Sequence, residues 1–83
     1  MNLKGKTVLI TGASGGIGRA TARALATAGS KLLLTGLEQE DLDRVTEELT
    51  IGGATVAAHP ANLLDSDDRR RLLDWIRDQA PLD

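Results

Sequence analysis

The stretch Thr11-Gly12-Ala13-Ser14-Gly15-Gly16-Ile17-Gly18 decides the fold of this 83-residue chain. It lies between a short apolar run at 7–10 and a segment whose apolar residues follow helical spacing. Glycine adopts positive φ without steric cost and lets a ligand approach the backbone closely. The helix that follows adds unpaired N–H groups and a positive dipole end. The stretch therefore predicts a strand–turn–helix unit whose turn admits a phosphate group; the alternative is a tight turn of small residues.

The bulk composition indicates one small domain. At 83 residues the chain is near the size at which a buried core becomes marginal, and Trp75 is its one aromatic residue. The absence of cysteine excludes disulfides and thiolate metal sites. A net charge of −2 argues against nucleic acid as a partner, and no apolar run is long enough to span a membrane. We expect a cytoplasmic protein with neither a nucleic-acid nor a membrane partner.

The chain alternates between strand and helix patterns. Strands are expected at 6–11, 31–35 and 54–59, and helices at 16–28, 39–50 and 66–79. Such alternation is typical of βαβ units in a parallel sheet. In the first helix, the stripe expected to face the sheet is Ile17, Ala20, Thr21, Ala24, Leu25 and Ala28. In the other two helices the inward residues are expected to be Leu42, Val45, Leu49, Leu72, Leu73, Ile76 and Ala80.

The glycine stretch resembles the phosphate loop Thr-Gly-x-x-x-Gly-x-Gly of the short-chain dehydrogenase/reductase family, with Gly12, Gly16 and Gly18 at its glycine positions. Gly15 also fits the Thr-Gly-x-x-Gly-x-x-Gly spacing of the family's longer branch, so the loop does not select a branch. The resemblance implies an α/β, Rossmann-type βαβαβα half, with three parallel strands in the order 3-2-1 and helices on both faces. Residues 1–83 would then be a partial NAD(P)-binding domain that stops before the fourth strand and the catalytic half.

The resemblance also implies which residues bind a dinucleotide. The loop would hold its phosphates through Gly12, Ser14, Gly15, Gly16, Ile17 and Gly18. Leu37, at the end of the second strand, would lie near the adenosine ribose. Family members usually select NAD with an Asp at the position of Gly36, or NADP with an Arg at the position of Leu37 or Gly15. This chain has neither residue at those positions, so the cofactor is NAD or NADP, undecided.

Asn62 and Leu63 follow the third strand, where the family usually carries Asp-Leu or Asp-Val. In the family that Asp accepts a hydrogen bond from the adenine amino group. Asn keeps a carbonyl acceptor, so an adenine contact is expected here too. The alternative is an Asn favoured only by turn geometry.

No catalytic residue is expected in this chain. The family's chemistry uses a Ser and a Tyr-x-x-x-Lys pair, and this sequence contains no Tyr. The resemblance implies the NAD(P)-binding N-terminal segment of an oxidoreductase that transfers hydride between a nicotinamide cofactor and a carbonyl/alcohol pair, similar in overall look to 3-oxoacyl-(acyl carrier protein) reductases. The alternative is a non-catalytic module that binds a nucleotide or associates through the edge of its first strand. The expected partners are a dinucleotide and either a second copy or a missing C-terminal half.

Overall fold

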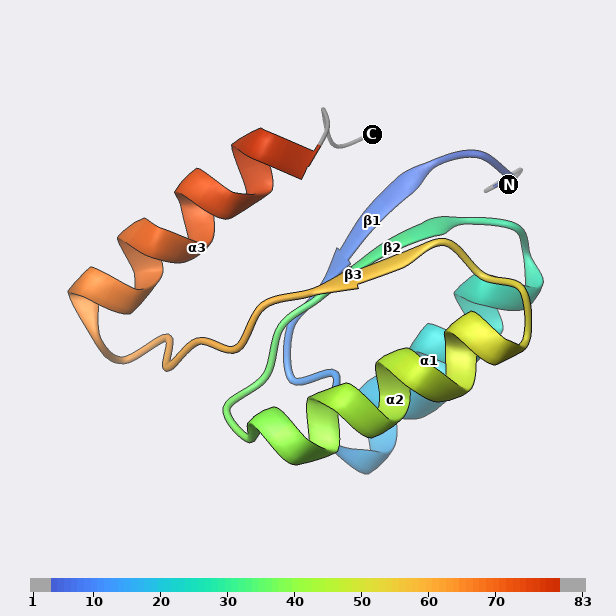
Figure 1. Cartoon of the computed structure of the whole chain (residues 1–83), viewed down its shortest axis with the longest axis horizontal. Helices are drawn as coiled ribbons and strands as arrows, with labels where there is room; N and C mark the ends of the chain where they lie inside the picture. Colours follow the sequence, from blue (N-terminus) through green and yellow to red (C-terminus); the bar gives the residue numbers. More distant parts are fainter. Residues whose placement is uncertain (1–3, 80–83) are drawn as a thin grey trace.

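The computed structural model describes residues 4–79. Its elements alternate as predicted (Figure 1): β1 (Thr7–Ile10), α1 (Gly16–Thr27), β2 (Lys31–Leu34), α2 (Gln39–Ile51), β3 (Val56–Ala58) and α3 (Ser66–Gln79). The range predicted for α3 is the observed one, and the other elements differ from prediction by no more than two residues at either end.

The three strands form one parallel sheet in the order β1-β2-β3, which is the predicted 3-2-1 order. Leu32 of the central strand pairs in register with Val8 on one side and Val56 on the other. All three leucines of β2 are buried, as expected for a parallel strand covered on both faces. The predicted α/β, Rossmann-type arrangement is confirmed.

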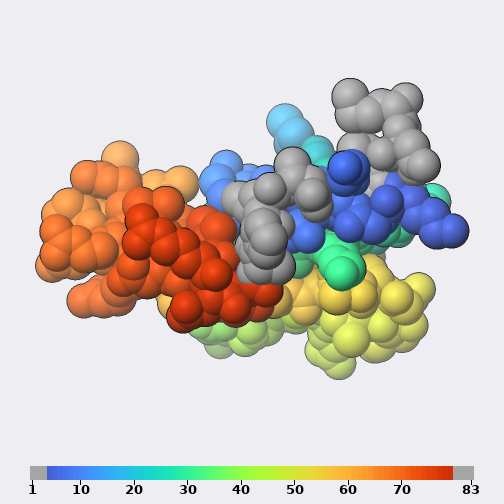
Figure 2. All heavy atoms as spheres, turned by 90° about the horizontal axis from the view of Figure 1, so that it is seen from above, coloured from blue at the N-terminus to red at the C-terminus, as the bar shows by residue number. Residues whose placement is uncertain are grey.

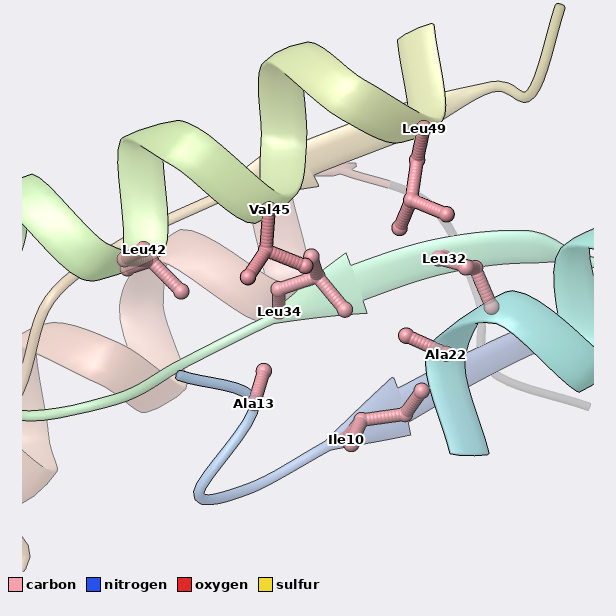
Figure 3. Close-up of a cluster of buried hydrophobic side chains, with 8 residues drawn as sticks. All are labelled: Ile10, Ala13, Ala22, Leu32, Leu34, Leu42, Val45 and Leu49. Carbon is pink, nitrogen blue, oxygen red and sulfur yellow. The ribbon is translucent and has the colours of Figure 1, made fainter. Parts of the chain in front are cut away.

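The main core lies between the sheet and the helices α1 and α2 (Figure 3). Its buried members are Ile10, Ala13, Ala22, Leu32, Leu34, Leu42, Val45 and Leu49. The inward residues predicted for α2 are all among them. The two helices are also joined by ion pairs, because both Arg19 and Arg23 of α1 contact the Glu48 carboxylate of α2.

The predicted inward stripe of α1 is wrong. Ile17 is 87% exposed, and Ala20, Thr21, Ala24 and Ala28 are exposed as well. The residue that α1 buries fully is Ala22, and of the predicted stripe only Leu25 packs partly against the core. Methyl groups occur on several faces of this alanine-rich helix, so spacing alone did not identify the face in contact. The small side chain of Ala22 lets the helix approach the sheet closely, and Gly18 lets it approach the backbone of Gly12 and Ala13.

Helix α3 lies on the other side of the strands from α1 and α2 (Figure 1), and its first half extends beyond the rest of the molecule at one end (Figure 2). Leu72 is buried as predicted, but Leu73 is 54% exposed, and Ala80 lies outside the described residues. The Trp75 ring stacks on His59, which follows β3, with 5.3 Å between ring centroids. Adjacent residues lie on different sides of a helix, and here the side that carries Leu72 is the buried one, so Leu73 is left uncovered.

Candidate functional site

The carboxyl ends of the three strands meet at one edge of the sheet. The Ala13 N–H donates to the Thr35 carbonyl at 3.0 Å, and the Ala61 N–H donates to the Gly36 carbonyl at 3.0 Å. These bonds join the segments that follow β1, β2 and β3. A cavity of about 280 Å³ opens beside them. It is lined by Gly12, Thr35, Gly36, Leu37, Ala61, Asn62, Leu63 and Leu64.

Four predicted site residues therefore come together at this cavity: Gly12, Leu37, Asn62 and Leu63. The others, Ser14, Gly15, Gly16, Ile17 and Gly18, lie outside its lining and form the turn and first turn of α1. Thr35, Ala61 and Leu64 also line the cavity, and the motif had not indicated them. Their position could have indicated them, because Thr35 directly follows β2, Ala61 and Leu64 lie in the loop after β3, and ligands of open α/β sheets bind beyond the carboxyl ends of strands.

The turn at 12–15 is closed by a hydrogen bond from the Gly15 N–H to the Gly12 carbonyl, at 3.1 Å. Gly12 has a φ of +63°, a backbone conformation that residues other than glycine rarely adopt. A Cβ atom built on Gly16 would meet nothing within 4 Å, so the space outside this residue is open.

Helix α1 begins with free backbone donors. Its first hydrogen bond runs from the Arg19 N–H to the Gly15 carbonyl, at 2.9 Å. Within residues 4–79, no atom accepts from the N–H groups of Gly16, Ile17 or Gly18. No acidic side chain lies in this first turn, and Gly15 offers no side-chain cap. Free donors at the positive end of a helix dipole attract an anion such as phosphate.

The end of β2 presents a cavity wall without charge. Leu37 is 64% exposed, and no Asp, Glu, Lys or Arg is among the lining residues. A Cβ atom on Gly36 would lie 2.7 Å from the Ser14 hydroxyl oxygen, so Ser14 fills the space next to Gly36. Thr35 is 1% exposed, and its hydroxyl oxygen has no hydrogen-bond partner in the described part of the chain.

The loop after β3 forms an Asn-centred turn. The Asn62 side-chain oxygen accepts from the Leu64 N–H at 3.0 Å, and its backbone oxygen accepts from the Asp65 N–H at 3.0 Å. The turn geometry considered as the alternative for Asn62 is thus present, while the residue also lines the cavity. No atom of residues 4–79 accepts from the Leu63 N–H, and the Leu63 side chain is 41% exposed.

A larger cavity, of about 520 Å³, lies at the opposite end of the sheet, and none of the predicted site residues lines it. Its walls include Gly29 and Gly52, which lie within two residues of the C-termini of α1 and α2. The negative ends of two helix dipoles disfavour an anion there. The smaller cavity is therefore the candidate site, despite its size.

A model of the short chain dehydrogenase family matches residues 6–82. Among curated proteins, an oxidoreductase of Bacillus subtilis, YvrD, is 35% identical over 83 residues, which are all of this chain and 31% of that protein. A dehydrogenase/reductase SDR family protein 7-like of Anopheles gambiae is 44% identical over 66 residues, or 80% of this chain and 21% of that protein. The chain thus spans less than a third of the length of these two relatives.

Two solved structures of similar proteins align with nearly the whole of this chain and about a third or less of their own. A short-chain dehydrogenase/reductase from Burkholderia phymatum, in complex with NAD, aligns with a TM-score of 0.84 at 32% identity, covering 90% of this chain and 27% of that one. A 3-oxoacyl-(acyl-carrier-protein) reductase from Agrobacterium tumefaciens C58, with NADP bound, aligns with a TM-score of 0.85 at 32% identity, covering 99% of this chain and 32% of that one.

Within residues 4–79, no helix combines the length and apolar character needed to cross a membrane.

Proposed function

This chain is a member of the short-chain dehydrogenase/reductase family, and on that basis we propose that it binds the ADP-ribose part of NAD or NADP. The phosphates would be held by the turn at 12–15 and the first turn of α1, including Ser14. The adenine would occupy the cavity beside Leu37, Asn62 and Leu63. The proposal depends most on one observation, the three unpaired N–H groups of Gly16, Ile17 and Gly18 next to an open space.

The residues present fit such a cofactor. The open side of Gly16 leaves room for a group that approaches the backbone. Exposed apolar side chains at Leu37, Leu63 and Leu64 supply walls for a flat aromatic ring. The buried Thr35 hydroxyl has no hydrogen-bond partner within the described chain, and a ribose hydroxyl or a bound water would provide one. The Leu63 N–H is a free donor for a ring nitrogen of the base.

The same cavity supports no strong choice between the two cofactors. An acidic side chain near the ribose would favour NAD, and an arginine would favour NADP. The lining contains neither. The two solved relatives hold NAD in one case and NADP in the other. We propose that this chain binds both with similar affinity.

The activity we propose is that of a longer protein. A bound nicotinamide cofactor would supply hydride exchange with a carbonyl/alcohol pair. The residues of this chain bind and orient the cofactor, and the proton donor comes from elsewhere, since the sequence contains no Tyr. We also propose that the protein is cytoplasmic and that residues 1–83 form part of its NAD(P)-binding domain.

A second candidate function is association through β1. Among the described strands, β1 pairs with β2 alone, so one of its edges carries no strand partner within residues 4–79. A strand edge of this kind can pair with a strand of another polypeptide. The partner would be a second copy or a C-terminal half of the same family fold.

Calorimetric titration tests the proposed function. The 83-residue chain, with its helix content checked by circular dichroism, is titrated with ADP-ribose, NAD, NADP and nicotinamide mononucleotide. We expect the first three to bind with similar affinities, and the mononucleotide, which lacks the adenosine half, to bind much more weakly. A folded chain that binds none of the first three would contradict the proposal.

A further inference from the structure

The first turn of α3 is hydrogen-bonded to the loop that precedes it. A carboxylate oxygen of Asp68 accepts from the Asn62 N–H at 2.9 Å. The Arg69 guanidinium donates to the Leu63 carbonyl at 2.8 Å. Both bonds span six residues and link the helix directly to two residues of the candidate nucleotide cavity.

Neither bond is needed to start the helix. Asp65 already caps α3, because its side-chain oxygen accepts from the N–H groups of Asp67 and Asp68, at 2.8 and 3.2 Å. The Asp67 carboxylate in the first turn also complements the helix dipole, and it makes no hydrogen bond to the loop within residues 4–79. The side chains of Asp68 and Arg69 thus hold the loop in addition to an ordinary cap.

These bonds leave one free donor in the loop. The N–H groups of Asn62, Leu64 and Asp65 all have acceptors within the chain. The Leu63 N–H has none among the described residues, and Leu63 lines the cavity. The Asn62 carbonyl, which lies in the same peptide plane as this N–H, accepts from the Asp65 N–H. The bonds to Asp68 and Arg69 hold the peptide groups on both sides of that plane, so together these contacts fix the direction of the Leu63 N–H.

We infer that Asp68 and Arg69 are positioning residues of the adenine pocket, which set the orientation of the Leu63 N–H without touching the nucleotide. This inference rests on the proposed function. Asp68 is itself oriented, since its other carboxylate oxygen accepts from Arg71 at 2.9 Å. Helix α3 contributes no residue to the main buried cluster, so its link to the loop is a local one.

The test compares two probes that engage different parts of the site, 5′-AMP for the adenine pocket and inorganic pyrophosphate for the turn before α1. In Asp68→Ala and Arg69→Ala we expect the dissociation constant for 5′-AMP to rise about tenfold, which corresponds to about 1.4 kcal/mol. The dissociation constant for pyrophosphate should stay unchanged. Asp68→Asn, which keeps an acceptor oxygen, should recover most of the 5′-AMP affinity.

The chain offers matched controls in Asp67→Ala and Arg70→Ala. They remove the same charges from neighbouring positions of α3 without breaking a bond to the loop. These controls should bind 5′-AMP like the unmodified chain. An equal loss of affinity for both probes in Asp68→Ala would indicate general destabilisation. Unchanged 5′-AMP affinity in Asp68→Ala and Arg69→Ala would mean that the two side chains do not position the loop. Either result overturns this inference and leaves the proposed function in place. Failure of the unmodified chain to bind 5′-AMP and ADP-ribose would instead overturn the proposed function with it.

Discussion

Gly18 packs directly against the carbonyl group of Gly12. A Cβ atom built on Gly18 would lie 2.1 Å from the Gly12 oxygen and 2.8 Å from its carbonyl carbon. Backbone atoms cannot move aside as a flexible side chain can, so only glycine fits at this position. Gly16, two residues earlier, would direct its Cβ into open space. Two glycines of one motif therefore differ in their surroundings: Gly18 allows α1 to pack against the turn, and Gly16 borders open space.

The first prediction concerns Gly16. From the motif alone, Gly16→Val and Gly18→Val are both expected to abolish nucleotide binding by filling the space of the pyrophosphate. We now expect that effect for Gly16 alone, because a side chain added there would meet no protein atom within 4 Å and would enter the space proposed for the pyrophosphate. Gly16→Val should keep the circular dichroism spectrum and lose ADP-ribose binding in calorimetry. Binding with unchanged affinity in this variant would remove the turn from the site.

The second prediction concerns Gly18. Its Cβ would clash with the backbone of Gly12 and Ala13, so Gly18→Val should unfold the turn or the whole chain. We expect a lower thermal midpoint in circular dichroism, with the Gly16→Val variant as the matched control. A Gly18→Val chain that melts at the same temperature as that control would show that the turn accommodates the side chain.

The third prediction concerns cofactor preference. Since no charged side chain lines the cavity, the unmodified chain should discriminate only weakly between NAD and NADP. Leu37→Arg should shift the preference toward NADP, because a hydrogen bond to a charged group contributes about 1.5–3 kcal/mol. The ratio of the two dissociation constants measures this. A preference of about a thousandfold in the unmodified chain, roughly 4 kcal/mol, would mean that a further determinant exists.

The fourth prediction concerns self-association through β1, expected near Val8 and Ile10. Ile10 is a member of the buried core, so the backbone edge is the better candidate contact. The carbonyls of Lys6 and Ile10 accept from N–H groups of the β2 segment. Because the backbone groups of successive strand residues point to alternate sides, the N–H and carbonyl of Leu9 point to the outer edge. Sedimentation of the 83-residue chain should show association that increases with concentration, and Leu9→Pro should reduce it. A monomer at all concentrations would contradict this prediction.

The fifth prediction is that the 83-residue chain does not reduce carbonyl compounds with either cofactor. A positioned proton donor contributes about 10²–10⁴-fold to such reactions, and the sequence has no Tyr to act as one. The assay follows the absorbance of the reduced cofactor, and boiled protein serves as the background. Turnover above that background would contradict the division of roles proposed between this chain and the rest of a longer protein.

The strand–helix alternation and the sheet order were predictable because strong local signals mark each element. The apolar run of β2 predicts a buried strand, and the spacing of Leu42, Val45 and Leu49 predicts a helix with one buried face. The inward face of α1 was predicted wrongly for a physical reason. Ala22 is buried and Ala24 is exposed, and two methyl groups of the same size cannot be ranked by hydropathy.

The candidate site was predictable where it depends on backbone freedom. Gly12 adopts the positive φ that a motif glycine indicates. The different roles of Gly16 and Gly18 could not be predicted, because they depend on which way each absent Cβ would point. The hydrogen bond from the Asn62 N–H to Asp68 could not be predicted either, because it depends on the path of the loop before α3.

The central claim, that a dinucleotide binds at the start of α1 and beside Leu63, is tested most directly by mapping amide signals. The ¹⁵N-labelled chain is titrated with ADP-ribose, and each backbone N–H is followed by nuclear magnetic resonance. We predict that the largest shifts occur at Gly16, Ile17, Gly18 and Leu63, whose N–H groups are unpaired among the described residues. The amides of Gly29, Gly52 and Gly53, at the larger cavity, should not respond. Shifts concentrated at that opposite end, or none at all in a folded chain, would contradict the account.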